Sequence, residues 1–164
     1  MYAYSFPKGP NPKVKMILPS GGASSPASRY ALVADDETAV RKLIVRALQI
    51  IGFDVLEAEN GKQALELSRQ NQVDLVVTDC QMPVMDGFTL IKKLKSELPQ
   101  TPVILVSGQN LGGPEMSEIG GRHAVQDVLH KPFPLLALHR AALRAVGRGS
   151  SAEGPFREER MKTV

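Results

Sequence analysis

The chain has 164 residues, of which 20 are Lys or Arg, 17 are Asp or Glu and one is Cys. That length fits one domain of ordinary size, which can bury an adequate core without disulfides or metal clips. A lone cysteine excludes an intramolecular disulfide framework and cannot build a zinc site, and it suits a reducing, cytoplasmic compartment. No apolar run approaches the roughly 20 residues of a membrane span, so we expect no membrane insertion.

The net charge of +3 comes from the two ends of the sequence. Residues 1–28 have three lysines and no acids, residues 29–147 have 13 basic and 14 acidic residues, and residues 148–164 have four basic and three acidic residues. The first stretch is rich in Pro, Ser and Gly, so we expect a disordered arm there, one domain over 29–147 and a flexible tail after it. The middle lacks the basic surface of a nucleic-acid binder, and we expect no direct contact with nucleic acid.

Strand-like and helix-like segments alternate between the two ends. Short apolar runs predict strands at 30–34, 54–58, 75–78, 103–106 and 125–129. Apolar residues at helical spacing predict helices at 38–51, 62–70, 88–98 and 135–146, and the Gly-rich stretch 109–122 leaves room for a short one. Buried strands that alternate with helices indicate an α/β fold, a doubly wound parallel sheet of five strands with helices on both faces.

Polar residues follow four of the predicted strands, where such sheets bind ligands. They are Asp35 and Asp36 after the first strand, Asp79 after the third, Ser107 after the fourth and Lys131 after the fifth. Each could simply cap a helix or face solvent. Gathered at one edge, however, carboxylates about 4 Å apart would repel by roughly 4 kcal/mol, so they need a compensating cation. Carboxylate oxygens suit Mg²⁺. A lysine and a hydroxyl suit a transferring phosphoryl group, which a carboxylate can accept as an acyl phosphate.

These strand-end residues also stand in recognisable motifs. Asp79 to Gly87 read D-C-Q-M-P-V-M-D-G, which resembles the D-x-x-M-P-x-M-D-G signature of response regulator receiver domains. Other motifs of that family are matched by Asp35-Asp36, Ser107-Gly108 and Lys131-Pro132-Phe133. The resemblance covers residues 29–146 and implies a flavodoxin-like sheet with the strand order 2-1-3-4-5.

The resemblance implies a role for each acid at this edge. Asp79 accepts the phosphoryl group from a histidine kinase or a phosphotransfer protein. Asp36 and Asp79 bind Mg²⁺ through their side chains, the backbone carbonyl of Gln81 is a third ligand, and Asp35 acts through bound water.

The same resemblance implies roles for the remaining motif residues. Ser107 donates a hydrogen bond to the phosphoryl oxygen and moves on activation, and Gly108 leaves space for access. Lys131 pairs with the phosphoryl group, and its bond to Pro132 is expected to be cis, an option specific to proline. Asp86-Gly87 is expected to form the turn that starts the third helix.

We therefore expect a single-domain response regulator that signals by phosphorylation-dependent contact with a separate effector protein. Residues after 147 are too few for a helix-turn-helix. The expected chemistry is limited to self-phosphorylation and loss of the phosphoryl group, so the chain is not expected to be an enzyme in the usual sense. One alternative is a phosphohydrolase, which typically needs a second acid where Gln81 stands. Another is a receiver-like interaction module that is never phosphorylated.

The second alternative is kept open by a departure from the family pattern. Val128 stands where the family usually has Tyr or Phe, so rotation of an aromatic ring cannot report phosphorylation. Order–disorder of the Gly-rich segment 109–124 is an alternative switch. Cys80 is expected to be an inert, partly buried residue, and the three histidines lack the spacing of metal ligands.

Overall fold

Five short strands with apolar sequences form one parallel sheet. The computed structural model describes residues 29–109, 111, 116–117, 119 and 124–147. The strands are β1 (Arg29–Ala34), β2 (Phe53–Ala58), β3 (Leu75–Asp79), β4 (Val103–Ser107) and β5 (Asp127–His130). They pair in the order β2-β1-β3-β4-β5, and all four pairings are parallel. The predicted five-stranded sheet and its order are confirmed.

Side chains alternate between the two faces of the sheet, as expected for strands with both faces covered. Leu32, Val76 and Leu105 belong to one hydrophobic cluster. Their neighbours in sequence, Val33 and Val77, belong to a second cluster. The two central strands, β3 and β4, are buried along their whole length. The core is therefore two layers of aliphatic side chains, one on each side of the sheet.

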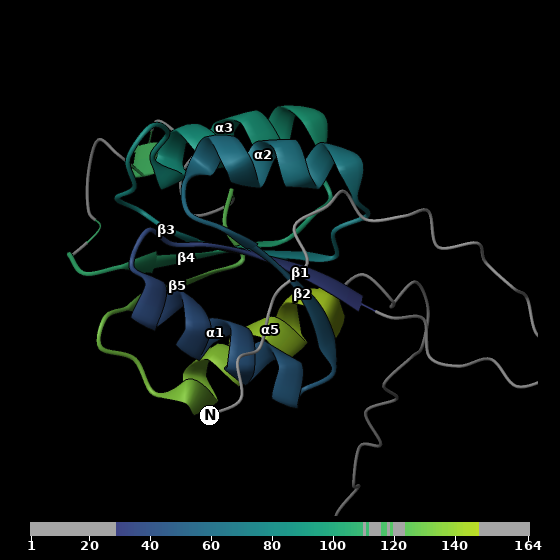
Figure 1. Cartoon of the computed structure of the whole chain (residues 1–164), viewed down its shortest axis with the longest axis vertical. Helices are drawn as coiled ribbons and strands as arrows, with labels where there is room; N and C mark the ends of the chain where they lie inside the picture. Colours follow the sequence, from purple (N-terminus) through teal and green to yellow (C-terminus); the bar gives the residue numbers. More distant parts are fainter. Residues whose placement is uncertain (1–28, 110, 112–115, 118, 120–123, 148–164) are drawn as a thin grey trace, which may run out of the picture.

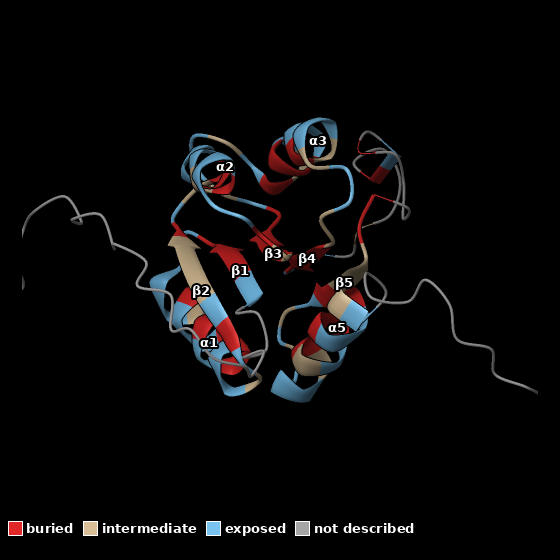
Figure 2. Ribbon diagram, turned by 90° about the vertical axis from the view of Figure 1, so that its right-hand side faces the viewer, coloured by how far each residue is buried: buried red, intermediate tan, exposed pale blue. Residues whose placement is uncertain are grey.

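Two pairs of helices cover these layers. Helices α1 (Thr38–Ile50) and α5 (Leu135–Gly147) lie on one face, and α2 (Gly61–Gln70) and α3 (Gly87–Glu97) lie on the other (Figure 1). Figure 2 shows that each helix turns its buried side toward the sheet. Each of these four helices begins and ends within one residue of its predicted range. Helix ends were predictable because the apolar spacing and the stop signals are both contained in the helix's own sequence. In the part of the chain that the structure describes, every helix is too short or too polar to span a membrane.

The last strand is the element that differs most from its prediction. The strand predicted at 125–129 begins instead at Asp127, which is in register with Ile104 of β4. Val125 is buried without being part of the ladder, because it packs into the core cluster on the α2–α3 side. The apolar side chain of Val125 therefore indicates packing in the core and not a place in a β-strand.

Some predictions fall on parts of the chain that the structure does not describe. The arm at 1–28 and the tail at 148–164 lie outside the described residues, as do His123 and much of the segment 109–124 with its proposed order–disorder switch. These predictions stay predictions.

Candidate functional site

The polar residues at the strand ends meet at one edge of the sheet. A cleft of about 510 Å³ opens there, and its lining includes Asp36, Asp79, Gln81, Ser107 and Lys131. The parallel topology explains this gathering, because β1, β3, β4 and β5 all end on the same side. All but one of the predicted phosphoryl-site and metal-site residues line this cleft.

The exception is Asp35, which lies below the cleft. Its side chain is only 1% exposed and its Oδ2 lies 3.0 Å from the Lys131 Nζ. Burial raises the pKa of this carboxyl, the charge on Asp79 adds to the rise, and the hydrogen bonds from Lys131 and Glu37 offset it only in part. The neighbouring acids of the Asp35-Asp36 pair therefore have different environments, one buried and one exposed.

Lys131 joins the two buried acids of the site. Its Nζ lies 2.6 Å from Asp79 Oδ1 as well as 3.0 Å from Asp35 Oδ2. Burial alone would lower the pKa of Lys131, but hydrogen bonds with the two carboxylates outweigh it and raise that pKa. The peptide bond between Lys131 and Pro132 is cis, as predicted. A single ammonium thus faces two carboxylates, which leaves this cluster with an excess of negative charge.

Asp79 is held on its other side by its own loop. Its Oδ2 accepts a hydrogen bond from the Gln81 backbone nitrogen at 2.7 Å. Gly87 packs directly against the Asp79 backbone, since a Cβ on Gly87 would lie 2.0 Å from the Asp79 carbonyl oxygen. Asp86 caps α3 by accepting a hydrogen bond from the Thr89 nitrogen at 2.8 Å. The expected structural role of Asp86-Gly87 is confirmed.

The donor set at the mouth of the cleft suits Mg²⁺. The predicted ligands are two carboxylates, Asp36 and Asp79, with the carbonyl of Gln81, and all three residues line the cleft. Among the described residues, no three His, Cys, Asp or Glu side chains are grouped so as to hold a metal on their own. A site completed by a carbonyl and water is characteristic of Mg²⁺, which keeps several waters when it binds to protein. The residues fit the ion, and their roles as ligands stay a prediction.

Ser107 lines the cleft, but its hydroxyl is engaged within its own loop. The hydroxyl donates to the Gln109 carbonyl at 2.8 Å and accepts from the Gln109 backbone nitrogen at 3.0 Å. A phosphoryl oxygen could take this donor only if the bond to the Gln109 carbonyl breaks. A Cβ on the adjacent Gly108 would meet no atom within 4 Å, so this side of the cleft is open.

The other residues singled out from the sequence lie at the border of the site or away from it. Cys80 is 4% exposed, and burial raises the pKa of its thiol to about 11, with a hydrogen bond to Ser107 opposing the rise. This agrees with an inert thiol. His139 is half-buried, with its Nε2 at 2.9 Å from the Ala47 carbonyl oxygen of α1, which indicates a packing role. Val128 is half-buried on β5, beside a smaller cavity of about 190 Å³.

One residue near the site was missed by the sequence analysis. Arg41 of α1 is 5% exposed and donates from Nη1 to the Asp35 carbonyl at 2.6 Å. The sequence did indicate that Arg41 is buried, because its spacing from Ile44, Val45 and Leu48 places it on the inward face of the helix.

Comparison with known proteins agrees with this geometry. A family model described as the response regulator receiver domain matches residues 31–143. The response regulator GtcR of Aneurinibacillus migulanus is 38% identical over 114 residues, which make up 69% of this chain and 46% of GtcR. The chain thus spans less than half the length of GtcR, and it spans 13% of the autoinducer 1 sensor kinase/phosphatase LuxN of Vibrio harveyi.

Solved structures show the same fold. The chemotaxis response regulator CheY4 of Vibrio cholerae has a TM-score of 0.64 and 26% identity, and the match covers 72% of this chain and 98% of CheY4. The receiver domain of the sensor histidine kinase PA1611 of Pseudomonas aeruginosa has a TM-score of 0.65 and 25% identity, with 74% of this chain and 99% of that domain covered. That structure has a magnesium ion coordinated in its active site cleft.

The family match, the sheet order and the residues at the carboxyl edge all agree. Phosphorylation and Mg²⁺ are general features of the receiver domains of two-component systems. This chain belongs to the response regulator receiver domain family.

Proposed function

We propose that this chain is a phosphorylatable receiver in which Asp79 takes a phosphoryl group from a histidine kinase or a phosphotransfer protein. The observation that carries the proposal is the contact of the Lys131 Nζ with both Asp79 and Asp35 beside an open polar cleft. The Asp79 carboxylate lines the cleft through which a donor would approach, and it faces a fixed cation. That is the arrangement that transfer to a carboxylate requires.

The transfer itself needs little from the protein beyond charge and position. A carboxylate oxygen of Asp79 attacks the phosphorus, and the new P–O bond forms as the P–N bond to the donor histidine breaks. The electron pair of the broken bond stays on the histidine ring nitrogen. Lys131 neutralises the phosphoryl oxygens, and the Ser107 hydroxyl donates to one of them after it leaves the Gln109 carbonyl.

The acids of the cleft would hold Mg²⁺ next to the reacting atoms. Asp36 and Asp79 would bind it through their side chains and Gln81 through its carbonyl, while Asp35 would act through water. When bound, the ion supplies positive charge that offsets the phosphoryl oxygens. Lys131 would remain the chain's own cation beside Asp35 and Asp79, where it offsets part of the negative charge of the carboxylates and the phosphoryl group.

We propose that the phosphorylated form signals by binding another protein and not by converting a further substrate. A phosphohydrolase would need a general acid or base two residues after Asp79, and the carboxamide of Gln81 cannot act as one. The carboxylate of Asp86 is engaged in capping α3. The chemistry we propose therefore ends with formation and loss of the acyl phosphate. The phosphorylated form would be recognised by a separate effector protein, which we propose as the second partner.

The test is phosphorylation by a small donor. The protein is incubated with acetyl phosphate and Mg²⁺, and the phosphorylated fraction is measured on a phosphate-affinity gel. We expect a shifted band that is absent with EDTA and absent in Asp79→Asn. Asp54→Asn is the matched control, because Asp54 is an exposed acid of β2 outside the cleft. A shifted band that persists in Asp79→Asn, or none in the unchanged protein, would refute the proposal.

A further inference from the structure

Arg41 is a buried cation that the phosphoryl chemistry does not use. Its side chain is 6% exposed, and among the described residues no other Lys, Arg or His belongs to the buried class. Arginine is seldom buried without partners, because removing an unpaired charge from water is costly. The partners of Arg41 therefore show what its burial accomplishes.

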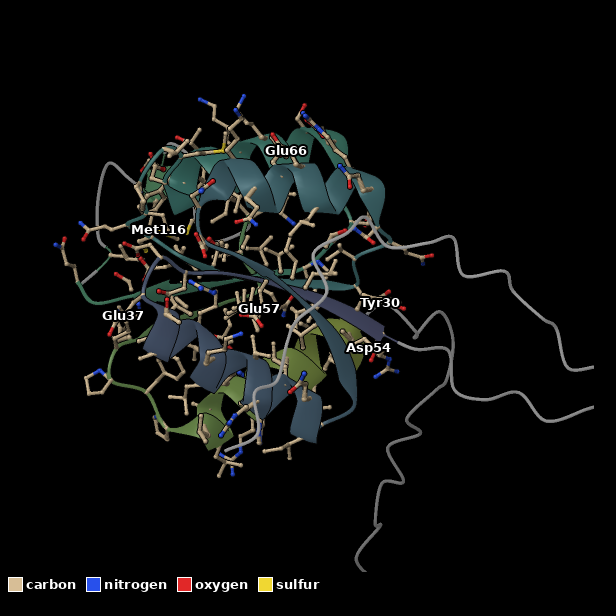
Figure 3. All side chains as sticks on the ribbon, viewed as in Figure 1. Tyr30, Glu37, Asp54, Glu57, Glu66 and Met116 are labelled. Carbon is tan, nitrogen blue, oxygen red and sulfur yellow. The ribbon has the colours of Figure 1, made fainter. Side chains whose placement is uncertain are left out.

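Apart from Thr38 of its own helix, whose Oγ1 lies 3.4 Å from the Arg41 Nη2, these partners come from two different parts of the fold. Arg41 Nη1 donates to the Asp35 backbone carbonyl at 2.6 Å, within the loop that carries the acidic pair. Its Nε donates to Glu57 Oε2 at 3.4 Å, and its Nη2 lies 3.7 Å from Glu59 Oε1. Figure 3 shows Glu57 beside α1 and Glu37 at the edge where α1 starts. The guanidinium thus connects the β2 side of the sheet to the loop between β1 and α1.

The contact with Arg41 completes the attachment of Asp35. The Asp35 nitrogen donates to the Ala58 carbonyl at 3.2 Å. Its Oδ1 accepts from the Glu37 nitrogen at 2.8 Å and its Oδ2 from Lys131 at 3.0 Å. With the Arg41 bond to its carbonyl, all four polar atoms of Asp35 have a partner. The position of the next residue, the cleft acid Asp36, is set through this attachment.

We propose that Arg41 is a positioning residue for the Mg²⁺ site. It holds the Asp35 carbonyl so that Asp35 stays below Lys131 while Asp36 faces the cleft. The inference rests on the proposed function, since it assumes that these acids bind the ion. Groups that orient metal ligands from outside typically change metal affinity by about tenfold or more when they are removed.

A simple charge effect predicts the opposite sign. A nearby cation repels Mg²⁺, so if Arg41 acted only through its charge, its removal would tighten Mg²⁺ binding. Its charge is already offset by Glu57 and Glu59. Positioning predicts weaker binding, and the direction of the change separates the two readings.

The experiment compares two cations that share one partner. Lys42 pairs with Glu57 at 2.8 Å, as Arg41 does at 3.4 Å, but Lys42 is exposed and donates only to that carboxylate among the contacts described. Mg²⁺ affinity is measured by calorimetric titration of the full chain with MgCl₂, without a phosphoryl donor. We expect Arg41→Met to raise the Mg²⁺ dissociation constant about tenfold. Lys42→Met should leave the dissociation constant unchanged or lower it slightly.

Arg41→Lys keeps the experiment decisive if Arg41→Met fails to fold. The lysine of Arg41→Lys retains the positive charge, but its single nitrogen cannot replace the separate guanidinium nitrogens that reach Asp35 and Glu57. We therefore expect the Mg²⁺ affinity of Arg41→Lys to lie between those of the unchanged protein and Arg41→Met. Affinity of Arg41→Lys equal to that of the unchanged protein would overturn the inference, as would tighter binding by Arg41→Met. No Mg²⁺ binding by the unchanged protein would instead overturn the proposed function. The two failures are therefore distinguishable.

Discussion

The two sides of the cleft at the carboxyl edge of the sheet are held in different ways. On the acid side, Asp35 and Asp79 are joined by Lys131, which comes from 96 residues further along the chain than Asp35. On the hydroxyl side, the Ser107 hydroxyl donates to and accepts from the Gln109 backbone, two residues away, and it also has a hydrogen bond with the Cys80 thiol. On the acid side, ion pairs thus join distant elements of the fold, whereas the hydroxyl is held mainly by a local turn.

This difference indicates where phosphorylation can act. Moving the acids would break buried contacts between distant elements, at a cost of about 1–3 kcal/mol for each buried polar group left unsatisfied. Releasing the Ser107 hydroxyl breaks one local bond, which a charged phosphoryl oxygen can replace with a stronger one. We therefore expect the acid side to stay in place and the hydroxyl side to carry the conformational change. With Val128 in place of an aromatic residue, that change cannot pass through a rotating ring.

The largest expected effect comes from breaking the acid side. Lys131→Met removes the cation that faces Asp79, and losing such electrostatic stabilisation slows transfer by about 10²–10³-fold. The rate is measured from acetyl phosphate at saturating Mg²⁺. The Lys131 Nζ lies 2.6 Å from Asp79 Oδ1 and competes with Mg²⁺ for that carboxylate, so Mg²⁺ binding should tighten in the same variant.

That pair of results has a clear contrary outcome. If Lys131→Met weakened Mg²⁺ binding, Lys131 would be holding the acids in place and not competing for them. Arg41→Met is the matched comparison, because the two cations that contact Asp35, Arg41 and Lys131, are expected to change Mg²⁺ affinity in opposite directions.

A smaller effect is expected on the hydroxyl side. Ser107→Ala removes one hydrogen bond to a charged oxygen, worth about 1.5 kcal/mol, so transfer should slow by about tenfold. Mg²⁺ affinity should not change, since Ser107 contacts none of the predicted ligands in the hydrogen bonds described. Parallel measurements of the transfer rate and of Mg²⁺ affinity test this split. A loss of Mg²⁺ affinity equal to that of an acid variant would show that the two sides are not independent.

Much of this arrangement could be predicted from the sequence, because it depends on local patterns. Apolar runs marked the strands, and residues after parallel strands must meet at one edge, so Asp79 and Lys131 were expected to be neighbours. The family resemblance gave the two acids of Asp35-Asp36 different roles, but the strand pattern could not show which of them is buried. Both residues are acids after the same strand, and only the contacts of Asp35 with Lys131 and Arg41 decide which one is buried.

The residues that were missed or misplaced had ambiguous signals. Arg41 was overlooked because a charge suggests solvent, although its helical position put it on the inward face. Val125 was assigned to a strand because it is apolar, although it is buried by packing and lies outside the ladder. In both cases the residue type indicates burial or exposure on average, and tertiary contacts determine the outcome.

The smallest expected effect concerns the loop that follows Asp79 on the acid side of the cleft. Val84 has φ of 69° and is 79% exposed, a left-handed conformation that is strained for a β-branched residue. The loop is held there by neighbours, since the Gly61 nitrogen donates to the Met85 carbonyl at 3.0 Å and the Gly87 nitrogen to the Cys80 carbonyl at 2.9 Å. Asn tolerates this conformation, so Val84→Asn should raise the free energy of unfolding in urea by about 1 kcal/mol.

Ile50→Asn is the matched control for that exchange. Ile50 is also β-branched and 74% exposed, but it lies in α1 with an ordinary negative φ. No gain in stability is expected there. The transfer rate of Val84→Asn should equal that of the unchanged protein, because the two glycine contacts, and not Val84, fix the loop. If Val84→Asn gained stability but accepted the phosphoryl group more slowly, the strained backbone at Val84 would itself help to position Asp79. The position of Asp79 would then depend on strain in the loop and not on the two glycine contacts alone.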